Sequence, residues 1–204
     1  MQHRIFIAIN LPEDIKKKLA DCQGKWPELP IRWTKKENLH ITLVFLGYLN
    51  DEELLEVCKI TKEVASRNQS FSVNLNKICY GPPKKMPPRM VWVEGEKSEE
   101  FTSLREDLEK SLMTSEEVHF SSEKRAFSPH ITLGRIKVWE FRQIAPEERP
   151  KVSEEISLNF EVNSIEVMES QLKRGGSEYS VLESYPLPER SEGREMNEVQ
   201  RTKP

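Results

Sequence analysis

The chain has 204 residues, of which 36% are hydrophobic and 32% are charged, and its formal net charge is −3 at pH 7. A chain of this length can bury a core of its own, and no run approaches the roughly 18 apolar residues that a membrane-spanning helix needs. The negative charge argues against broad, sequence-independent binding to nucleic-acid backbones, because that mode needs a large cationic surface.

The N-terminus and the cysteines bear on where the protein works. The first residues, MQHRIFIAINLPED, lack the long apolar segment of a signal peptide, so we expect a cytoplasmic location. The three cysteines, Cys22, Cys58 and Cys79, are odd in number, far apart and without metal-ligand spacing. We therefore expect them to be reduced thiols.

Hydrophobic periodicity predicts alternating strands and helices along the chain. Proline and acids in a first turn predict helix starts at 11–14 and 51–53, and the loop GPPKKMPPR separates the two strands of a hairpin. The charged stretch 140–155 contains two prolines and is predicted to be a loop with one short helix. In chain order, we predict a strand at 4–10, a helix from 11, strands at 31–33 and 39–46 (stopping at Gly47), a helix at 51–67, strands at 71–80 and 90–94, a helix at 98–113, and strands at 130–138, 160–168 and 178–184.

The tetrapeptide His-Ile-Thr-Leu occurs twice, at 40–43 and at 130–133, each time within a predicted strand. Two of the four histidines in the chain lie in this repeat. Because side chains alternate across a strand, the histidine and the threonine of each motif share one face, while the isoleucine and the leucine point to the other. Each motif therefore offers an imidazole and a hydroxyl to one side and an apolar surface to the other.

If the two strands lie side by side about a pseudo-two-fold axis, both imidazoles and both hydroxyls meet in one cleft. Imidazole can act as a base or as an acid near neutral pH, and phosphodiester cleavage needs one of each. Threonine hydroxyls can donate hydrogen bonds to the non-bridging phosphate oxygens, where charge grows in the transition state. The repeat thus favours a phosphodiesterase in which His40 and His130 are catalytic and Thr42 and Thr132 bind the substrate.

Other interpretations of the repeat are weaker. Either histidine alone could be an ordinary strand residue whose polar atoms are satisfied locally. A metal site is disfavoured because no His-Glu-x-x-His helix and no cluster of acidic ligands accompanies the two histidines. We therefore expect no metal and no cofactor.

The segments around the repeat resemble a known family. RIFIAINLPED, IRWTKKENLHITLVFLG, PPRMVWVEG, RAFSPHITLGR and VMESQLKRGGSEYSVL, in this order, are similar to the 2H phosphoesterases. Among the 2H phosphoesterases, these segments resemble most those of the LigT-like RNA 2′,3′-cyclic phosphodiesterases, once named 2′-5′ RNA ligases. The resemblance implies an α+β fold with two pseudo-symmetric halves, each an antiparallel sheet flanked by helices, and an active-site cleft between the halves. We expect one domain over residues 1–188 and a disordered tail at 189–204.

The resemblance also implies roles for single residues. One motif histidine is expected to protonate the O3′ leaving group and the other to activate water, which gives a 2′-phosphate end. We assign His40 as the acid and His130 as the base, but the pseudo-symmetry leaves the reverse assignment open. Arg135 matches a basic residue often found in the family, but it lies one residue off the His/Thr alternation, so a bulge would be needed to bring it to the phosphate. The substrate-binding residues expected besides the two histidines are Thr42, Thr132, Arg135, Arg174 and Tyr179.

Aromatic and basic side chains could hold the rest of an RNA end. Phe45 is predicted to face the apolar side of its strand, which leaves Trp33 and Phe127 as candidate platforms for a base. Lys84 and Lys85 could guide an RNA end towards the cleft, although a solvated loop is the simpler interpretation.

The expected partner is RNA or an oligonucleotide ending in a 2′,3′-cyclic phosphate, with nucleotides as a further candidate ligand, and the chain is expected to act as a monomer. Two alternatives stay open: a nucleotide-binding module of the same fold without catalysis, and a 2′-5′ RNA ligase that uses the same residues in the reverse direction.

Overall fold

The computed structural model describes residues 1–83, 85–122, 128–174 and 176–190. Within these residues, no helix has both the length and the apolar character that crossing a membrane requires. The strands are β1 (His3–Asn10), β2 (Ile31–Trp33), β3 (His40–Leu49), β4 (Phe71–Gly81), β5 (Met90–Gly95), β6 (His130–Ile136), β7 (Ser153–Val162), β8 (Ser164–Lys173) and β9 (Gly176–Pro186). The α-helices are α1 (Glu13–Cys22), α2 (Asp51–Arg67), α3 (Glu99–Thr114) and α4 (Val138–Gln143), and the short 3-10 turns are η1 (Gln23–Lys25), η2 (Lys36–Asn38) and η3 (Pro146–Glu148).

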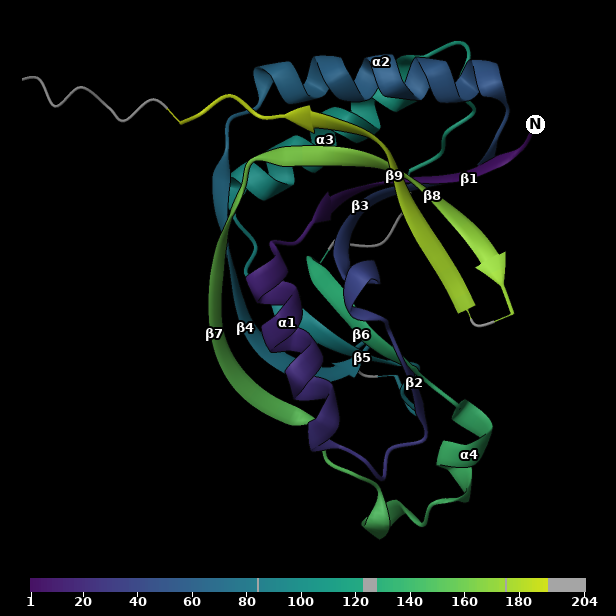
Figure 1. Cartoon of the computed structure of the whole chain (residues 1–204), viewed down its shortest axis with the longest axis vertical. Coiled ribbons are helices and arrows are strands. Elements are labelled where there is room, and N and C mark those ends of the chain that lie inside the picture. The colour runs from purple at the N-terminus through teal and green to yellow at the C-terminus, as the bar shows by residue number, and fades with distance from the viewer. Residues whose placement is uncertain (84, 123–127, 175, 191–204) are drawn as a thin grey trace, which may run out of the picture.

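All strands join one antiparallel sheet in the order β7-β4-β5-β6-β3-β1-β8-β9, with β2 paired to β6. Apart from the short β2, the sheet consists of two halves of four strands, and these halves meet where β3 lies beside β6 through the residue pair Ile41 and Ile131. The halves mirror one another in chain order, because β1-α1-β3 in one corresponds to β5-α3-β6 in the other. The predicted α+β fold with two pseudo-symmetric halves is confirmed (Figure 1).

Helices that follow strands of one half pack against the strands of the other half. In Figure 1, α2 and α3 lie together over the strands β1, β3, β8 and β9, and the Arg105 side chain of α3 donates to the carbonyl of Leu43 in β3 at 3.2 Å. The turn after α1 contacts the opposite half, since Lys25 forms an ion pair with Glu154 of β7. A helix that is connected in sequence to the strands of one half thus packs on the other half. Because the two halves are joined in this way, the buried apolar side chains form one main core.

Three predicted boundaries are wrong. Strand β3 does not stop at Gly47 but runs on to Leu49, because Gly47 takes a φ of 83° and absorbs a shift in the register with β1. The strand predicted at 130–138 ends at Ile136, and Val138 begins α4. The strand predicted at 160–168 is the end of β7 and the start of β8, which are separated at Asn163 and pair with different strands, β7 with β4 and β8 with β1 and β9.

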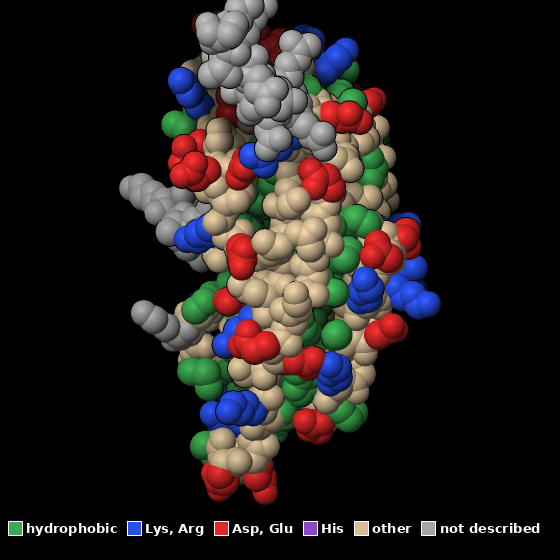
Figure 2. All heavy atoms as spheres, turned by 90° about the vertical axis from the view of Figure 1, so that its left-hand side faces the viewer, with side chains coloured by type: hydrophobic (Ala, Val, Ile, Leu, Met, Phe, Trp, Pro, Cys, Tyr) green, Lys and Arg blue, Asp and Glu red, His purple; other side chains and the backbone are tan. Residues whose placement is uncertain are grey.

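Only the last residues of β7, 160–162, fall within a predicted strand. Its first three residues lie in the charged stretch 140–155 that is predicted to be a loop, and most of its side chains are exposed or half-buried. It is an edge strand, and charged side chains are common on edges because they discourage pairing with other chains. Figure 2 shows the face on which β7 and β4 lie, where acidic and basic side chains intermingle and neither forms a broad patch.

The end of the described chain is held by the fold. The backbone N–H of Ser70 donates to the carbonyl of Pro188 at 2.8 Å, and the N–H of Arg190 donates to the Ser70 hydroxyl at 3.2 Å. The tail is predicted at 189–204. Its first two residues are described, and residues 191–204 lie outside the described residues.

We expect a substitution at Gly81 to lower the free energy of unfolding. A Cβ added to Gly81 in β4 would lie 2.1 Å from Cδ2 of the buried Trp92 in β5, so the indole would have to move. Overpacking of this kind costs about 1–3 kcal/mol. The measurement is urea unfolding of Gly81→Ala, with Gly24→Ala as the control because no atom lies within 4 Å of its added Cβ. Equal unfolding midpoints for the two variants would contradict this packing.

Candidate active site

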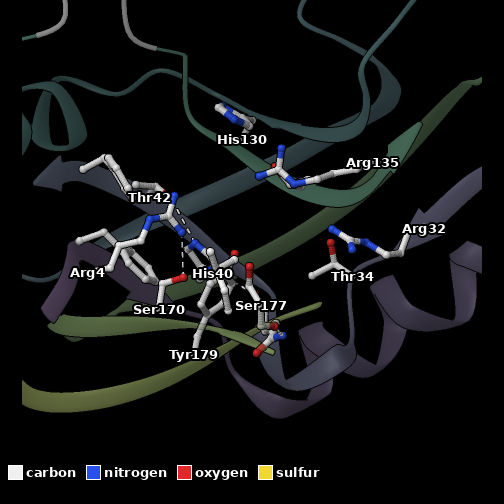
Figure 3. Close-up of a pocket in the computed structure, with 15 residues that line it drawn as sticks. Arg4, Arg32, Thr34, His40, Thr42, His130, Arg135, Ser170, Ser177 and Tyr179 are labelled. Atoms are coloured by element: carbon white, nitrogen blue, oxygen red, sulfur yellow. Dashed lines mark hydrogen bonds between the residues drawn. The ribbon is translucent and has the colours of Figure 1, made fainter. Parts of the chain in front are cut away.

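The two predicted motifs face each other across one cavity of about 430 Å³, which lies at the junction of the two half-sheets. His40 and Thr42 reach it from β3, and His130 and Thr132 from β6. Burying Ile41 and Ile131 in the core turns both polar pairs to the cavity, as the alternation of side chains requires. Figure 3 shows His130 on one side of this cavity and His40 on the other.

The two imidazoles are held in the same way. Nδ1–H of His40 donates to the carbonyl of Asn38 at 2.7 Å, and Nδ1–H of His130 donates to the carbonyl of Ser128 at 2.8 Å. Because a carbonyl can only accept, Nδ1 carries the proton in both rings and Nε2 is the acceptor of the neutral ring. The Thr42 hydroxyl donates to Nε2 of His40 at 3.0 Å.

Aromatic rings pack against both imidazoles. Trp92 stacks on His130 with ring centroids 3.9 Å apart and an interplanar angle of 22°. Phe6 and Tyr179 contact the His40 ring at centroid distances of 5.0 and 5.1 Å, the latter edge to face. These rings fix the orientation of the imidazoles and keep water away from them.

Burial keeps both histidines neutral. Burial, together with the nearby His130 and Lys16, lowers the pKa of His40 to about 4, although the hydrogen bond to Asn38 opposes the shift. Burial also lowers the pKa of His130, against the hydrogen bond to Ser128 and the charge of Glu94. In the free protein both imidazoles are therefore uncharged at neutral pH.

A bulge follows each motif and decides what else faces the cavity. Thr132 pairs with Trp92 and Gly134 with Val91, so Leu133 is the extra residue on β6; Leu43 is the matching extra residue on β3. The bulge that Arg135 was expected to need is therefore present, and Arg135 lines the cavity.

The prediction for Phe45 is wrong for the same reason. Phe45 follows the bulge in β3 as Arg135 follows the bulge in β6, so it faces the cavity instead of the apolar side, with 48% of its surface exposed. Strict alternation predicts the opposite face because it assumes an unbroken strand.

Three arginines surround the cavity, and sequence reasoning missed two of them. Arg4 of β1 donates to the Ser170 hydroxyl at 3.0 Å, and its guanidinium lies 4.8 Å from the centroid of the Phe45 ring. Arg32 of β2 pairs directly across from Arg135 of β6. Within the part of the chain that the structure describes, none of the three forms a salt bridge. A chain with net negative charge thus carries a strongly basic cavity.

Arg135 and the hydroxyl of Thr132 have weak hydrogen-bond partners in the free protein. A guanidinium nitrogen of Arg135 lies 3.7 Å from the sulfur of Met90, and the Thr132 hydroxyl lies 4.0 Å from the same sulfur. Thioether sulfur is a poor acceptor. Both donors are therefore available to a phosphate oxygen.

The remaining predicted residues have three outcomes. Tyr179 of β9 lines the cavity as expected. Arg174 is exposed in the turn after β8 and is not among the lining residues, and Trp33 lines only a neighbouring hollow. Phe127 and Lys84 lie outside the described residues.

A cavity in which two neutral imidazoles, two hydroxyls and three guanidinium groups converge is suited to acid–base chemistry on a phosphate ester. Among residues 1–83, 85–122, 128–174 and 176–190, no group of three or more His, Cys, Asp or Glu side chains could hold a metal ion.

Comparison with known proteins places the chain in a family. The model of the LigT like phosphoesterases matches residues 9–92 and again residues 93–179, so that each match contains one His-Ile-Thr-Leu motif. The chain belongs to this family, as its resemblance predicted.

Several relatives have names and structures. A Thermus thermophilus protein named RNA 2′,3′-cyclic phosphodiesterase is 31% identical over 193 residues, covering 90% of each chain. A Methanocaldococcus jannaschii protein of the same name is 28% identical, covering 89% of this chain and 99% of the relative. The crystal structure of the Thermus thermophilus protein TT0787 superposes with a TM-score of 0.77 at 31% identity, covering 90% of this chain and 97% of that one. Escherichia coli LigT, crystallised with 3′-AMP, shares the fold at 24% identity, with a TM-score of 0.74 and 92% and 99% of the two chains covered.

We expect the stability of the protein to report the neutral, buried His40. Its folded-state pKa of about 4 lies below the ordinary value of 6.5, so the unfolded chain takes up the proton first as the pH falls. This contribution to stability is complete above pH 6.5 and is lost as the pH falls to 4, by at most about 3 kcal/mol. The measurement is the free energy of unfolding of wild type and His40→Gln at several pH values.

The variant is needed because another histidine acts in the opposite direction. His3 contacts Glu169 and Asp51 at 2.8 and 3.0 Å, and these bonds raise its pKa. Its contribution is complete below the ordinary pKa and is lost as the pH rises through the raised one. If the difference in stability between wild type and His40→Gln does not change between pH 7 and pH 4, His40 is not held neutral by the fold.

Proposed function

We propose that this chain is a cyclic phosphodiesterase that hydrolyses 2′,3′-cyclic phosphate ends of RNA or oligonucleotides to 2′-phosphate ends without a metal ion. The observation that carries the proposal is that both His-Ile-Thr-Leu motifs face one arginine-lined cavity. Membership of the LigT like phosphoesterases and the names of the relatives support the reaction.

The substrate supplies what the free site lacks. Acid–base catalysis needs one protonated imidazole, and both His40 and His130 are neutral before the substrate binds. An anion within about 4–6 Å raises the pKa of an imidazole. A cyclic phosphate between the two rings therefore draws one proton into the site, and mutual repulsion of the rings discourages a second.

The reaction then needs no other proton carrier. The neutral imidazole takes a proton from water through Nε2 while the water oxygen attacks phosphorus. The bond from phosphorus to O3′ breaks, and the protonated imidazole gives its proton to O3′. The products are a 2′-phosphate and a free 3′ hydroxyl. The histidine that was neutral is now protonated, and the histidine that was protonated is now neutral.

The hydroxyls and guanidinium groups stabilise the charge on the phosphate. Thr42, Thr132 and Arg135 can donate to the non-bridging oxygens, where negative charge grows as water attacks. Removing one such donor from a preorganised site typically costs about 10²–10³ in rate. Tyr179 supports His40 by edge-to-face packing and borders the space for the nucleoside.

We expect substitution of either motif histidine to lower turnover by orders of magnitude. The substrate is an oligonucleotide that ends in a 2′,3′-cyclic phosphate, assayed in EDTA, with the product end identified. His40→Ala and His130→Ala should each lose about 10²–10⁴-fold in kcat, because each removes one proton transfer. His119→Ala is the matched control, since His119 is exposed and does not line the cavity.

The outcomes separate the functions. A rate that collapses in EDTA and returns with zinc or manganese contradicts the two-histidine mechanism. If folded wild type binds the oligonucleotide and turns over no cyclic phosphate, the chain is a nucleotide-binding module.

A sulfur leaving group tells the acid from the base. The assignment made from the sequence takes His40 as the acid, whereas the lowering of its pKa to about 4 by burial favours His130 as the proton carrier. Sulfur leaves without protonation, so a cyclic phosphorothiolate with sulfur at the 3′ position bypasses the acid. With His40 as the acid, His40→Ala should regain at least about tenfold relative activity on this substrate and His130→Ala none. The reverse pattern would exchange the two roles.

A further inference from the structure

A second, smaller hollow opens from the edge of the catalytic cavity. This side groove is lined by Arg32, Trp33, Thr34, Lys35, Arg135 and Ser177, among other residues, and has a volume of about 60 Å³. Four of these six residues also line the cavity, so the two spaces are continuous. Trp33 and Lys35 belong to the side groove alone. Figure 3 shows Arg32 and Thr34 at this end, away from His40.

Two positive charges face each other in the side groove. Arg32 and Arg135 are direct partners in the antiparallel pairing of β2 with β6. Like charges directly opposite one another in a sheet are destabilising. Neither arginine forms a salt bridge with any residue that the structure describes. An anion placed between them would remove the repulsion and gain two charge-assisted contacts.

A third cation extends the same arrangement. Lys35 lines the side groove but not the catalytic cavity, and no Asp or Glu is among the described residues that line the groove. The neighbouring acid, Glu178, is already bound by Lys173 at 2.5 Å. Arg32, Lys35 and Arg135 therefore give the side groove three positive charges, with the hydroxyl residues Thr34 and Ser177 also in its lining.

We propose that the side groove binds the phosphodiester that precedes the terminal nucleotide of the substrate, so that the enzyme acts on oligonucleotide ends in preference to mononucleoside cyclic phosphates. This inference rests on the proposed function. The preceding phosphate and the cyclic phosphate are attached to the same ribose, so the first must lie directly beside the catalytic cavity. The groove is small and cationic, which suits a phosphate better than a base.

The experiment compares three substrates that differ only upstream of the cyclic phosphate. They are a mononucleoside 2′,3′-cyclic phosphate, a dinucleotide with a normal phosphodiester link, and the same dinucleotide with an uncharged methylphosphonate link. For wild type, kcat/KM should be about tenfold higher with the charged link than with either other substrate, the size of one charge-assisted hydrogen bond. The preference should weaken as salt is added.

Lys35→Gln and Lys36→Gln form the matched pair of variants. Lys35 lines the side groove alone, whereas the adjacent Lys36 is bound to Glu13 at 2.9 Å and lies outside the groove. Lys35→Gln should lower the preference for the charged dinucleotide by about threefold to tenfold. Lys36→Gln should keep the wild-type preference.

The inference is overturned if wild type treats the charged and the uncharged link alike, or if Lys35→Gln and Lys36→Gln change the preference equally. Affinity for dinucleotides that end in a 2′-phosphate gives the same comparison without turnover. If wild type turns over none of the substrates, the proposed function fails, and the side groove is then judged on these affinities. Tighter binding of the charged link that Lys35→Gln weakens would still support it.

Discussion

The pairing of Ile41 with Ile131 is the contact on which the site depends. It is the one place where β3 and β6 meet, and it joins the two halves of the sheet. Because both isoleucines are fully buried, the polar residues on either side of them must point the other way. A one-residue slip of this pairing would turn an imidazole into the core. The helices that cross from one half to cover the other hold the register in place.

The bulge after each motif gives the pseudo-symmetric site its asymmetry. In regular strands without bulges at Leu43 and Leu133, the side chains at 45 and 135 would lie on the apolar face. With them, one half offers the ring of Phe45 to the cavity and the other offers the guanidinium of Arg135. The two pseudo-symmetric positions therefore line the cavity with different side chains, an aromatic ring in one half and a cation in the other.

Burial and charge act against each other in this cavity. The rings around His40 and His130 remove water and keep both imidazoles neutral, while three arginines supply a positive potential that the chain as a whole lacks. A neutral imidazole does not repel the arginines. In the mechanism that we propose, a bound phosphate satisfies the arginines and raises the pKa of the imidazoles at the same time, so that anion binding prepares the proton transfer.

The sequence by itself determined the chemistry: a His-Ile-Thr-Leu motif that occurs twice places an imidazole and a hydroxyl on one face of each strand, whatever the strands pack against. It also determined the helix at 51–67, whose first turn and capping residues are local signals. Only the tertiary structure decided that Arg4 and Arg32 join the site, that Phe45 faces it, and that the charged stretch before Val162 is an edge strand. The physical reason is that alternation along a strand is fixed by the backbone, whereas bulges and cross-strand neighbours depend on the register between segments far apart in the chain.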